Sequence, residues 1–348
     1  MAQRSWLIDG LKVGASQLIV LHHLARYAPM AELVAPDWPR LSAWLADEAR
    51  YVVQLFLVVG GFLAAQGLAQ REHGLMRLLL QRAVRLVPML AVALLAVLLA
   101  SAWLPAGRWP DWVSPWPSAG VLAAHLLLLQ DVLGIDSLSA GAWYVAIDLQ
   151  CYALLAAGAV LLHRHPERPL WQSPLPWAVA ALTLASIAWF NRNAAFEAWA
   201  PYFFGAYGLG ALAAWARRSR ALALLFTLVC VVQLALAWFE PRPRGVAACL
   251  TAAALLTLAS RRATIGGCTR WLADAADACY GVFVIHYAVI VAATALWLRL
   301  DLRSVPAAYG LLLLAWAASL AAGAALHQRV GVPLSRVPWA RLPRVGAT

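Results

Sequence analysis

The sequence predicts an all-α fold, a polytopic integral membrane helical bundle of about ten transmembrane helices with both termini in the cytoplasm. Hydrophobic residues make up 63% of the 348 residues and charged residues 12%, whereas soluble domains are about half apolar and about a quarter charged. Apolar runs recur along nearly the whole chain, and most can cross about 30 Å of hydrocarbon at about 1.5 Å per residue. The arginines cluster in short segments between these runs, as the positive-inside rule predicts.

Ten of the apolar runs are predicted to span the bilayer. With the N-terminus in the cytoplasm and the spans alternating in direction, 18 of the 27 basic residues fall on the cytoplasmic side. A further apolar segment, 119–133, is interpreted as a re-entrant or interfacial piece, because a full span there would turn the later arginine clusters outward. The predicted spans lie near residues 7–26, 51–69, 86–104, 142–162, 175–191, 199–216, 221–239, 246–260, 278–298 and 306–326.

Residues 1–330 are predicted to form one transmembrane domain, followed by a short basic cytoplasmic tail over 331–348. The apolar run after Arg4 has no small-residue cleavage site, so the first helix is expected to be retained. The net charge of +11 lies mainly between apolar runs, which argues against a nucleic-acid partner. The five cysteines show no paired or metal-type spacing, so we expect no disulfide and no metal site.

The segments expected on the outer face are rich in tryptophan and proline, most clearly residues 103–117, WLPAGRWPDWVSPWP. Such residues are typical of the aromatic belt at a membrane–water interface, which is the favoured interpretation. The alternative is a surface on which sugar rings stack.

The first predicted span contains LKVGASQLIVLHHL, residues 11–24, with one lysine and two histidines. Ionisable groups inside a bilayer are costly and are commonly functional. Lys12, the only lysine of the chain, and His23 share one helix face about 16 Å apart along the axis, while His22 points roughly 100° away. This helix face suits a ligand that lies across the membrane, with an anionic group bound at Lys12 and the reacting group at His23. The alternative is that Lys12 reaches the cytoplasmic headgroups and the histidines only bond to neighbouring helices.

Further polar residues occur in later spans. Arg82 and Arg85 share a face at the cytoplasmic end of the third span, where two guanidiniums suit phosphate binding and also a simple positive-inside anchor. Asp148 stands in the outer part of the fourth span and needs a partner there. His286 lies near the middle of the ninth span, where an interhelical hydrogen bond is the alternative to a functional role. The glycine-rich aromatic segment 202–212 indicates close helix packing.

Two stretches in the N-terminal part resemble membrane-bound acyltransferase family 3, the bacterial O-acyltransferases that modify surface glycans. That family begins with Asp-Gly-Leu-Arg, ten further residues and a histidine. Here residues 9–12 read Asp-Gly-Leu-Lys, and ten residues separate Lys12 from His23. The family's Phe-x-x-Ser-Gly-Phe-Leu in the second helix is similar to FLVVGGFL, residues 56–63.

Three later stretches extend the resemblance in the same order. The family's Arg-x-x-Arg-x-x-Pro matches residues 82–88. Its Trp-Ser-Leu-Ser-Val-Glu-x-x-Phe-Tyr resembles residues 143–152, with Asp148 at the glutamate position, and its late Ser-Tyr-x-x-Tyr-x-x-His resembles residues 279–286. The departures, which together suggest a divergent branch, are Lys12 for arginine, Gly60 for serine, Asp148 for glutamate and Cys279 for serine.

The resemblance implies an O-acyltransferase of the bacterial inner membrane that moves an acyl group from cytoplasmic acyl-CoA to a hydroxyl of a glycan or lipid-linked sugar at the outer face. Acetyl is the default acyl group, with succinyl or a longer chain as alternatives. His23 would act as general base or be acylated itself. Asp148 would orient His23 or stabilise its imidazolium, and His286 would hold the acceptor or the donor. The phosphates of coenzyme A would be bound by Lys12, Arg82 and Arg85.

A transporter or flippase is the rival interpretation, because histidines and acids within the membrane also suit proton-coupled transport. Many transporters are built from two similar halves with broken helices. The sequence shows no such repeat, and its ionisable residues gather in a few spans. The enzyme is therefore the favoured class.

Overall fold

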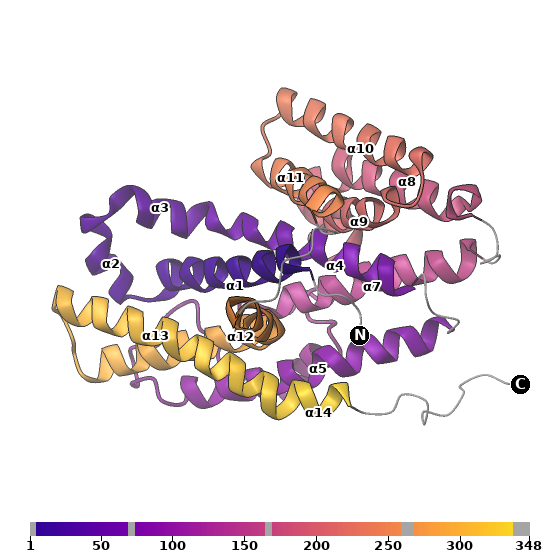
Figure 1. Ribbon diagram of the computed structural model, residues 1–348. Coiled ribbons are helices and arrows are strands. Elements are labelled where there is room, and N and C mark those ends of the chain that lie inside the picture. Colours follow the sequence, from indigo (N-terminus) through magenta and orange to yellow (C-terminus); the bar gives the residue numbers. More distant parts are fainter. Residues whose placement is uncertain (1–4, 69–73, 164–168, 259–266, 337–348) are drawn as a thin grey trace, which may run out of the picture.

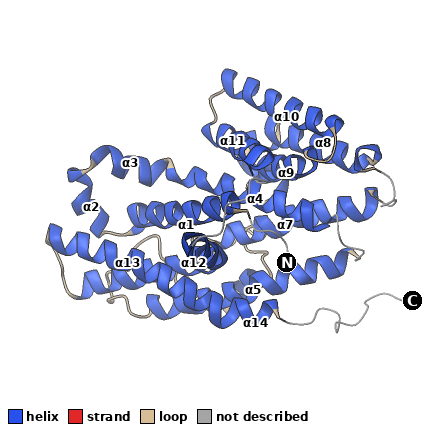
Figure 2. Ribbon diagram, in the orientation of Figure 1, coloured by secondary structure: helices blue, strands red, loops and turns tan. Residues whose placement is uncertain are grey.

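The computed structural model describes residues 5–68, 74–163, 169–258 and 267–336 (Figure 1). Within these ranges the chain is helical and contains no strand (Figure 2). The long helices are α1 (Trp6–Tyr27), α4 (Val53–Leu68), α5 (Leu75–Ser101), α7 (Ala142–Leu162), α8 (Pro174–Ala188), α9 (Ala200–Ala216), α10 (Arg220–Phe239), α11 (Pro243–Leu258), α12 (Gly267–Arg299) and α13 (Val305–Leu326). The short α-helices are α2 (Met30–Val34), α3 (Pro39–Asp47), α6 (Ala119–Leu126) and α14 (Val332–Ser335).

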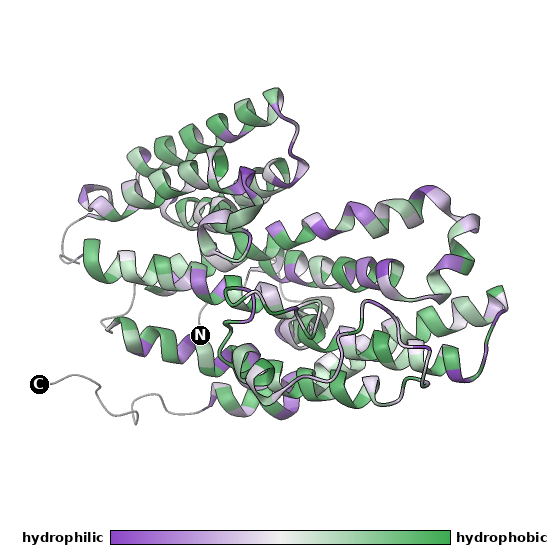
Figure 3. Cartoon of the chain, turned by 180° about the vertical axis from the view of Figure 1, so that it is seen from behind, coloured by the Kyte–Doolittle hydropathy of each residue, from purple (hydrophilic) through white to green (hydrophobic). Residues whose placement is uncertain are grey.

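Each predicted span coincides with one of the long helices, so the positions of these helices are confirmed. Within the described residues, seven helices are long and apolar enough to cross a membrane. In this count α4 and α8 include adjoining turns, as Ala49–Leu68 and Pro174–Arg192. Of the other three long helices, α1 carries Asp9, Lys12 and Arg26, and α9 and α11 are 17 and 16 residues long. The count of ten spans and the cytoplasmic position of both termini remain predictions. Figure 3 shows hydrophobic residues over most of the length of these helices.

Two helices begin well before the spans predicted for them. Helix α5 starts at Leu75 rather than near residue 86, and α12 starts at Gly267 rather than near residue 278. The added turns carry charged residues such as Arg77, Arg82 and Asp274. An apolar window therefore detects only the hydrocarbon-embedded part of a helix, whereas the backbone hydrogen bonds continue beyond that part.

The segment 119–133 holds only the eight-residue helix α6, about 12 Å long, which is too short for a full span. His125 in α6 is buried, and its imidazole Nδ1–H donates to the carbonyl of Val121 at 2.8 Å. Its Nε2 accepts from the backbone N–H of Leu138 at 3.0 Å. This histidine fixes the chain that leads into α7. The short α6 agrees with the interpretation of 119–133 as a re-entrant or interfacial piece, which stays a prediction.

Helix α12 lies at the centre of the bundle. Of its most apolar 18-residue window, 78% is buried, against 28% to 50% in the other six membrane-crossing candidates of the described chain. In Figure 1 it is seen nearly end-on, with α1, α5 and α13 around it. Polar side chains in the middle of α12, such as His286 and Thr294, are therefore enclosed by protein rather than lipid.

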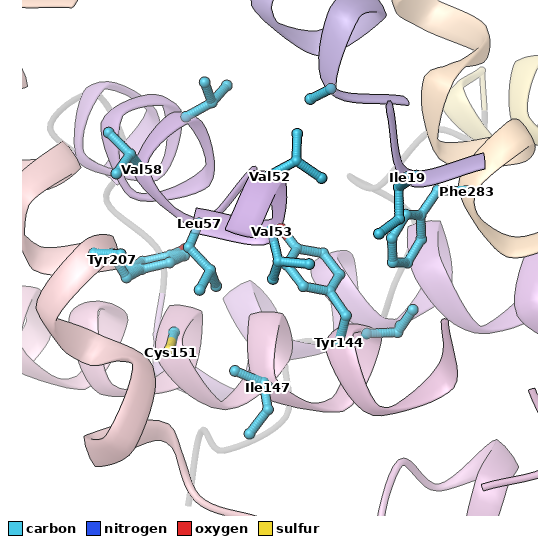
Figure 4. Packing of buried hydrophobic residues seen from close by; sticks show 14 of the residues in the cluster. Ile19, Val52, Val53, Leu57, Val58, Tyr144, Ile147, Cys151, Tyr207 and Phe283 are labelled. Carbon is cyan, nitrogen blue, oxygen red and sulfur yellow. The ribbon is translucent and has the colours of Figure 1, made fainter. Parts of the chain in front are cut away.

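Two glycines allow α4 and α9 to approach closely. A Cβ atom on Gly61 would lie 1.9 Å from the carbonyl oxygen of Tyr207, and one on Gly210 would lie 1.9 Å from the carbonyl oxygen of Val58. Leu57, Val58 and Tyr207 fill the space beside this contact (Figure 4). The close packing predicted for residues 202–212 is confirmed. The contact also holds Gly60 of α4 close to Asp148 of α7.

Candidate active site

The two predicted histidines meet at the contact between α1 and α12. These helices lie side by side with a constant offset of 263 residues. The Cys279 thiol contacts the Ser16 hydroxyl at 3.5 Å, and two helical turns further on, His23 Nδ1 lies 2.7 Å from His286 Nε2. Both imidazoles are buried. The ring planes lie within 9° of parallel and the centroids are 4.9 Å apart, so with this short nitrogen–nitrogen distance the rings meet edge to edge.

The hydrogen bonds fix the tautomers of this His23–His286 dyad. His286 Nδ1 lies 3.2 Å from the carbonyl oxygen of Val282, which can only accept, so Nδ1 carries the proton. In a neutral imidazole the other nitrogen is then an acceptor, so His286 Nε2 accepts from the Nδ1–H of His23. The unprotonated nitrogen of His23 is therefore Nε2, whose lone pair is available for a proton or an electrophile.

The adjacent histidine has a different partner. His22 Nδ1–H donates to the carbonyl of Leu45 in α3 at 2.7 Å. This bond ties α3 to α1, as the 100° difference in direction between the two side chains allows. The two neighbouring histidines therefore have different roles in the structure. His22 holds α3 against α1, and His23 pairs with His286.

His22 and His23 line a cavity of about 1120 Å³. Its walls come from the end of α1, residues 46–54, residues 111–115, residues 136–143 and the α10–α11 connection, all of which fall on the outer side in the predicted topology. The lining mixes aromatic rings with carboxylates and guanidiniums. A cavity of this size and chemistry can hold a polar organic molecule such as a sugar.

An aromatic cluster stands over the dyad. The ring of Tyr27 lies 5.4 Å from that of His23 and 23° from parallel, and the ring of Trp112 lies 5.3 Å from Tyr27. The hydroxyl of Tyr287 donates to the carbonyl of Trp112 at 2.7 Å, which fixes the tryptophan-rich loop to α12. Within this loop, Trp112 lines the cavity, whereas Trp116 is 61% exposed. The loop thus presents tryptophan side chains both to the cavity and to its outer surface.

An ion-pair network forms one side of the cavity rim. Glu240 pairs with Arg192 and Arg242, and the hydrogen bond from Arg242 lowers the pKa of the Glu240 carboxyl below its usual value. Arg242 and Arg244 donate to the carbonyl of Asn191 at 3.0 and 3.1 Å. The sequence reasoning missed this network, although the short run EPRPR at 240–244 was a visible signal of charges concentrated in a loop.

Asp148 pairs with Arg82 rather than with His23. The carboxylate Oδ2 accepts from Arg82 Nε at 3.1 Å and from Arg82 Nη2 at 2.5 Å, and the guanidinium lies 5.2 Å from the ring centre of Tyr152. The expectation that Asp148 orients His23 is therefore wrong; His286 takes that position. The physical reason is that a buried carboxylate is stabilised best by a fixed cation, and α5 supplies one.

Two of the departures from the family pattern touch each other. A Cβ atom on Gly60 would lie 3.3 Å from Asp148 Oδ1 and 3.3 Å from the ring of Tyr207. A serine at position 60 would therefore press on this carboxylate. The aspartate at position 148 and the glycine at position 60 therefore belong to one packed site.

Aromatic residues connect the ion pair with the dyad. Tyr144, one turn before Asp148 on α7, lies 5.0 Å from the ring of Phe283, and Phe283 lies 6.2 Å from the ring of His286. Figure 4 shows Tyr144 and Phe283 in the packed interior, with Ile19 of α1 beside Phe283. Residues 143–152 of α7 and residues 279–286 of α12 are thus connected by contacts between aromatic rings.

The predicted phosphate-binding residues lie away from the cavity. Lys12 is partly exposed, eleven residues before His23 on α1, and Arg85 is exposed, one turn after Arg82 on α5. Lys12, Arg82 and Arg85 are not among the residues that line the cavity of about 1120 Å³. The structure brings together His23 with His286 and Arg82 with Asp148 as two separate pairs.

Removing the carboxylate of the Arg82–Asp148 pair is expected to destabilise the fold. Asp148→Asn should lower the free energy of unfolding by about 3 kcal/mol, because it leaves a guanidinium within the bundle without its counter-charge. The side chain of Arg82 is 29% exposed, which keeps the effect at the lower end of the range for buried pairs. Thermal unfolding in detergent measures it.

The matched control replaces both partners. An Arg82→Met, Asp148→Leu double variant should regain most of the lost stability, since replacing a whole buried pair by apolar side chains is often neutral. Wild-type stability in Asp148→Asn would show that the pair contributes nothing to the fold.

The fold and this site define a multi-pass helical membrane protein with a histidine dyad at the wall of a polar cavity. The family model for the acyltransferase domain, family 3, matches residues 6–325. The chain therefore belongs to acyltransferase family 3 and is a membrane acyltransferase. Membership in this family does not favour the transporter alternative. Searches of the curated proteins and of the solved structures find no match.

Proposed function

We propose that the protein is an acyl-CoA-dependent O-acyltransferase of a bacterial inner membrane, which acylates a hydroxyl of a glycan or lipid-linked sugar at the outer face. The observation that carries this proposal is the His23–His286 dyad, whose free Nε2 belongs to a residue on the wall of the large polar and aromatic cavity. The family supplies the acyl transfer, and the cavity supplies the space for the acceptor. Acetyl is the simplest donor group.

In the proposed reaction His23 is the general base. Its Nε2 takes the proton from the acceptor hydroxyl while the oxygen attacks the thioester carbonyl carbon. The tetrahedral intermediate collapses with cleavage of the carbon–sulfur bond, and the departing thiolate takes the proton back from His23. The products are an O-acyl ester and free coenzyme A. His286 keeps the Nδ1–H of His23 in place throughout, as the acid does in a catalytic triad.

The donor is proposed to approach from the side of Lys12 and the two arginines. The guanidinium of Arg82 is paired with Asp148. In this proposal the carboxylate of Asp148 positions that guanidinium. Arg85 is exposed one turn along the same helix, and Lys12 is partly exposed. Lys12, Arg82 and Arg85 would then bind the phosphates, with Arg82 held in place by Asp148.

Replacing Arg85 tests the donor side. Arg85→Ala should raise the KM for acetyl-CoA by about tenfold or more, because a charge-assisted hydrogen bond to phosphate is lost, while the KM for the acceptor stays unchanged. Steady-state kinetics with both substrates varied measures the split. Equal changes in both constants would contradict the phosphate role.

Replacing His286 tests the dyad. His286→Leu should lower kcat by at least about tenfold, since His23 then lacks the acceptor that holds its tautomer. His286→Gln should recover part of the rate, because the amide oxygen can accept the same hydrogen bond. Equal rates in the two variants would assign His286 a packing role only.

The function itself is tested by mass spectrometry of surface glycans from cells with and without the gene. Cells that carry the gene should show glycans heavier by one acyl group per modified sugar, and the mass names the group. A gene encoding His23→Ala should restore the membrane protein without restoring that mass. Identical glycan masses in all strains, together with no acyl transfer by the purified protein, would overturn the proposal.

A further inference from the structure

A second cavity of about 890 Å³ lies between α1, the α2–α3 segment and α13. Its lining is largely apolar and includes Leu21 and Leu24 of α1 together with Leu312, Leu313 and Trp316 of α13. We refer to it as the lateral groove. It differs in character from the polar cavity that holds His23.

The polar groups of the lateral groove are mostly occupied by protein partners. Gln17 accepts from the indole N–H of Trp316 at 2.9 Å. The hydroxyl of Tyr309 accepts from the indole N–H of Trp38 at 3.0 Å and donates to Asp37 at 3.0 Å. Glu32 also lines the groove and is exposed. The remaining surface is mostly hydrocarbon, so the groove suits an apolar chain.

The sequence of α3 leaves the groove unfilled. The residues of α3 that line the groove are Ser42, Ala43 and Ala46, which have small side chains, together with Pro39 and Leu45. Leu41 lies about 200° from Ala43 around the helix axis and Trp44 about 200° from Ala46, and these two large side chains are 51% and 46% exposed. No residue of α3 is buried. The helix thus covers an apolar space that no protein side chain occupies.

The lateral groove adjoins the polar cavity at α3. Ala46 lines both spaces, and the carbonyl of Leu45 accepts the hydrogen bond of His22. On α1, Leu21 and Leu24 flank His22 and His23 directly, so the groove and the dyad lie at the same height of one helix. A single ligand with a polar head and a hydrocarbon chain fits this arrangement of adjoining spaces.

From this arrangement we infer that the lateral groove holds the hydrocarbon chain of the acceptor, whose sugar head lies in the polar cavity beside His23. The acceptor is thus a lipid-linked sugar rather than a free saccharide. This inference rests on the proposed function for the identity of the head. The chain site itself stands on the apolar lining, the small residues of α3 and the position of the groove beside the cavity at Ala46.

The test uses a hexadecyl β-glucoside that carries a diazirine near the end of its chain, with the purified protein in phosphatidylcholine nanodiscs. After illumination, mass spectrometry should place crosslinks on residues 21–24 and 312–316. Ala43→Phe, which fills the groove, should lower their yield by about tenfold. Leu41→Phe makes a similar change on the opposite face of α3 and should leave the yield unchanged.

A competition arm identifies the source of the chain. Unlabelled polyprenyl-phosphate glucoside should displace the probe, whereas added phosphatidylglycerol should not. Crosslinks spread evenly over lipid-facing helices, a yield that survives Ala43→Phe, or equal displacement by phosphatidylglycerol would each overturn the inference and leave an ordinary lipid contact. Unfolding temperatures of both variants near that of the wild type show that a lost crosslink is not a lost fold.

The two proposals fail in different ways. His23→Ala should keep the crosslink while losing acyl transfer, because the groove does not contain the dyad. Transfer to soluble and lipid-linked glucosides with the same kcat/KM would overturn the chain site alone. A retained crosslink without any transfer by the wild-type protein would overturn the enzyme function alone.

Discussion

His23→Ala is expected to reduce acyl transfer by about 10²- to 10⁴-fold, the range associated with a lost general base. The physical reason is the position of its Nε2, the one nitrogen of the dyad whose lone pair is not used by a hydrogen bond within the dyad. Transfer from labelled acetyl-CoA to an acylatable glycan, at equal membrane abundance of the variants, measures the loss.

His22→Ala is the matched control for this prediction. It removes the neighbouring imidazole and its bond to Leu45, but leaves the dyad intact. We expect activity within a few-fold of the wild type and a less firmly held α3. Full activity in His23→Ala together with loss in His22→Ala would exchange the roles assigned to the two residues.

Gly61→Ala is expected to prevent the accumulation of folded protein. The added methyl group would stand 1.9 Å from the carbonyl oxygen of Tyr207, a backbone atom that cannot move unless α4 and α9 separate. Such overpacking costs at least about 1–3 kcal/mol, and more where backbone must shift. Expression yield and monodispersity in detergent measure the outcome.

Gly67→Ala on the same helix provides the control, since nothing lies within 4 Å of a Cβ atom placed there. It should be neutral or slightly stabilising, because alanine has the higher helix propensity. A well-folded Gly61→Ala variant would mean that the α4–α9 contact tolerates separation.

The sequence was sufficient to locate the long helices because each contains a continuous apolar run, a signal that does not depend on tertiary structure. The first stretch of α5 and of α12 escaped detection because charged residues extend these helices beyond the hydrocarbon. The segment 28–50, with α2 and α3, has a mixed composition and lacks the long apolar run that marks a span. Its role as the cover of the lateral groove becomes visible only in three dimensions.

For the site, the sequence identified the right residue types but not all of their pairings. His23, His286 and Asp148 stand out because ionisable groups within a membrane need partners. Arg82 stands out because it shares a helix face with Arg85. Which group pairs with which depends on how α1, α5, α7 and α12 pack, and one sequence does not contain that information. Asp148 was matched with His23 by analogy with a triad, whereas the structure gives each a different partner.

The hydrogen bond from His286 to the carbonyl of Val282 has a consequence for energy coupling. A peptide oxygen accepts a hydrogen bond but has no proton to pass on. The two imidazoles therefore do not form a path for proton transfer beyond His286. In the proposed reaction, a proton that arrives at His23 must leave through the same nitrogen. Esterification at this site would then be electrically silent with respect to protons and independent of the proton-motive force.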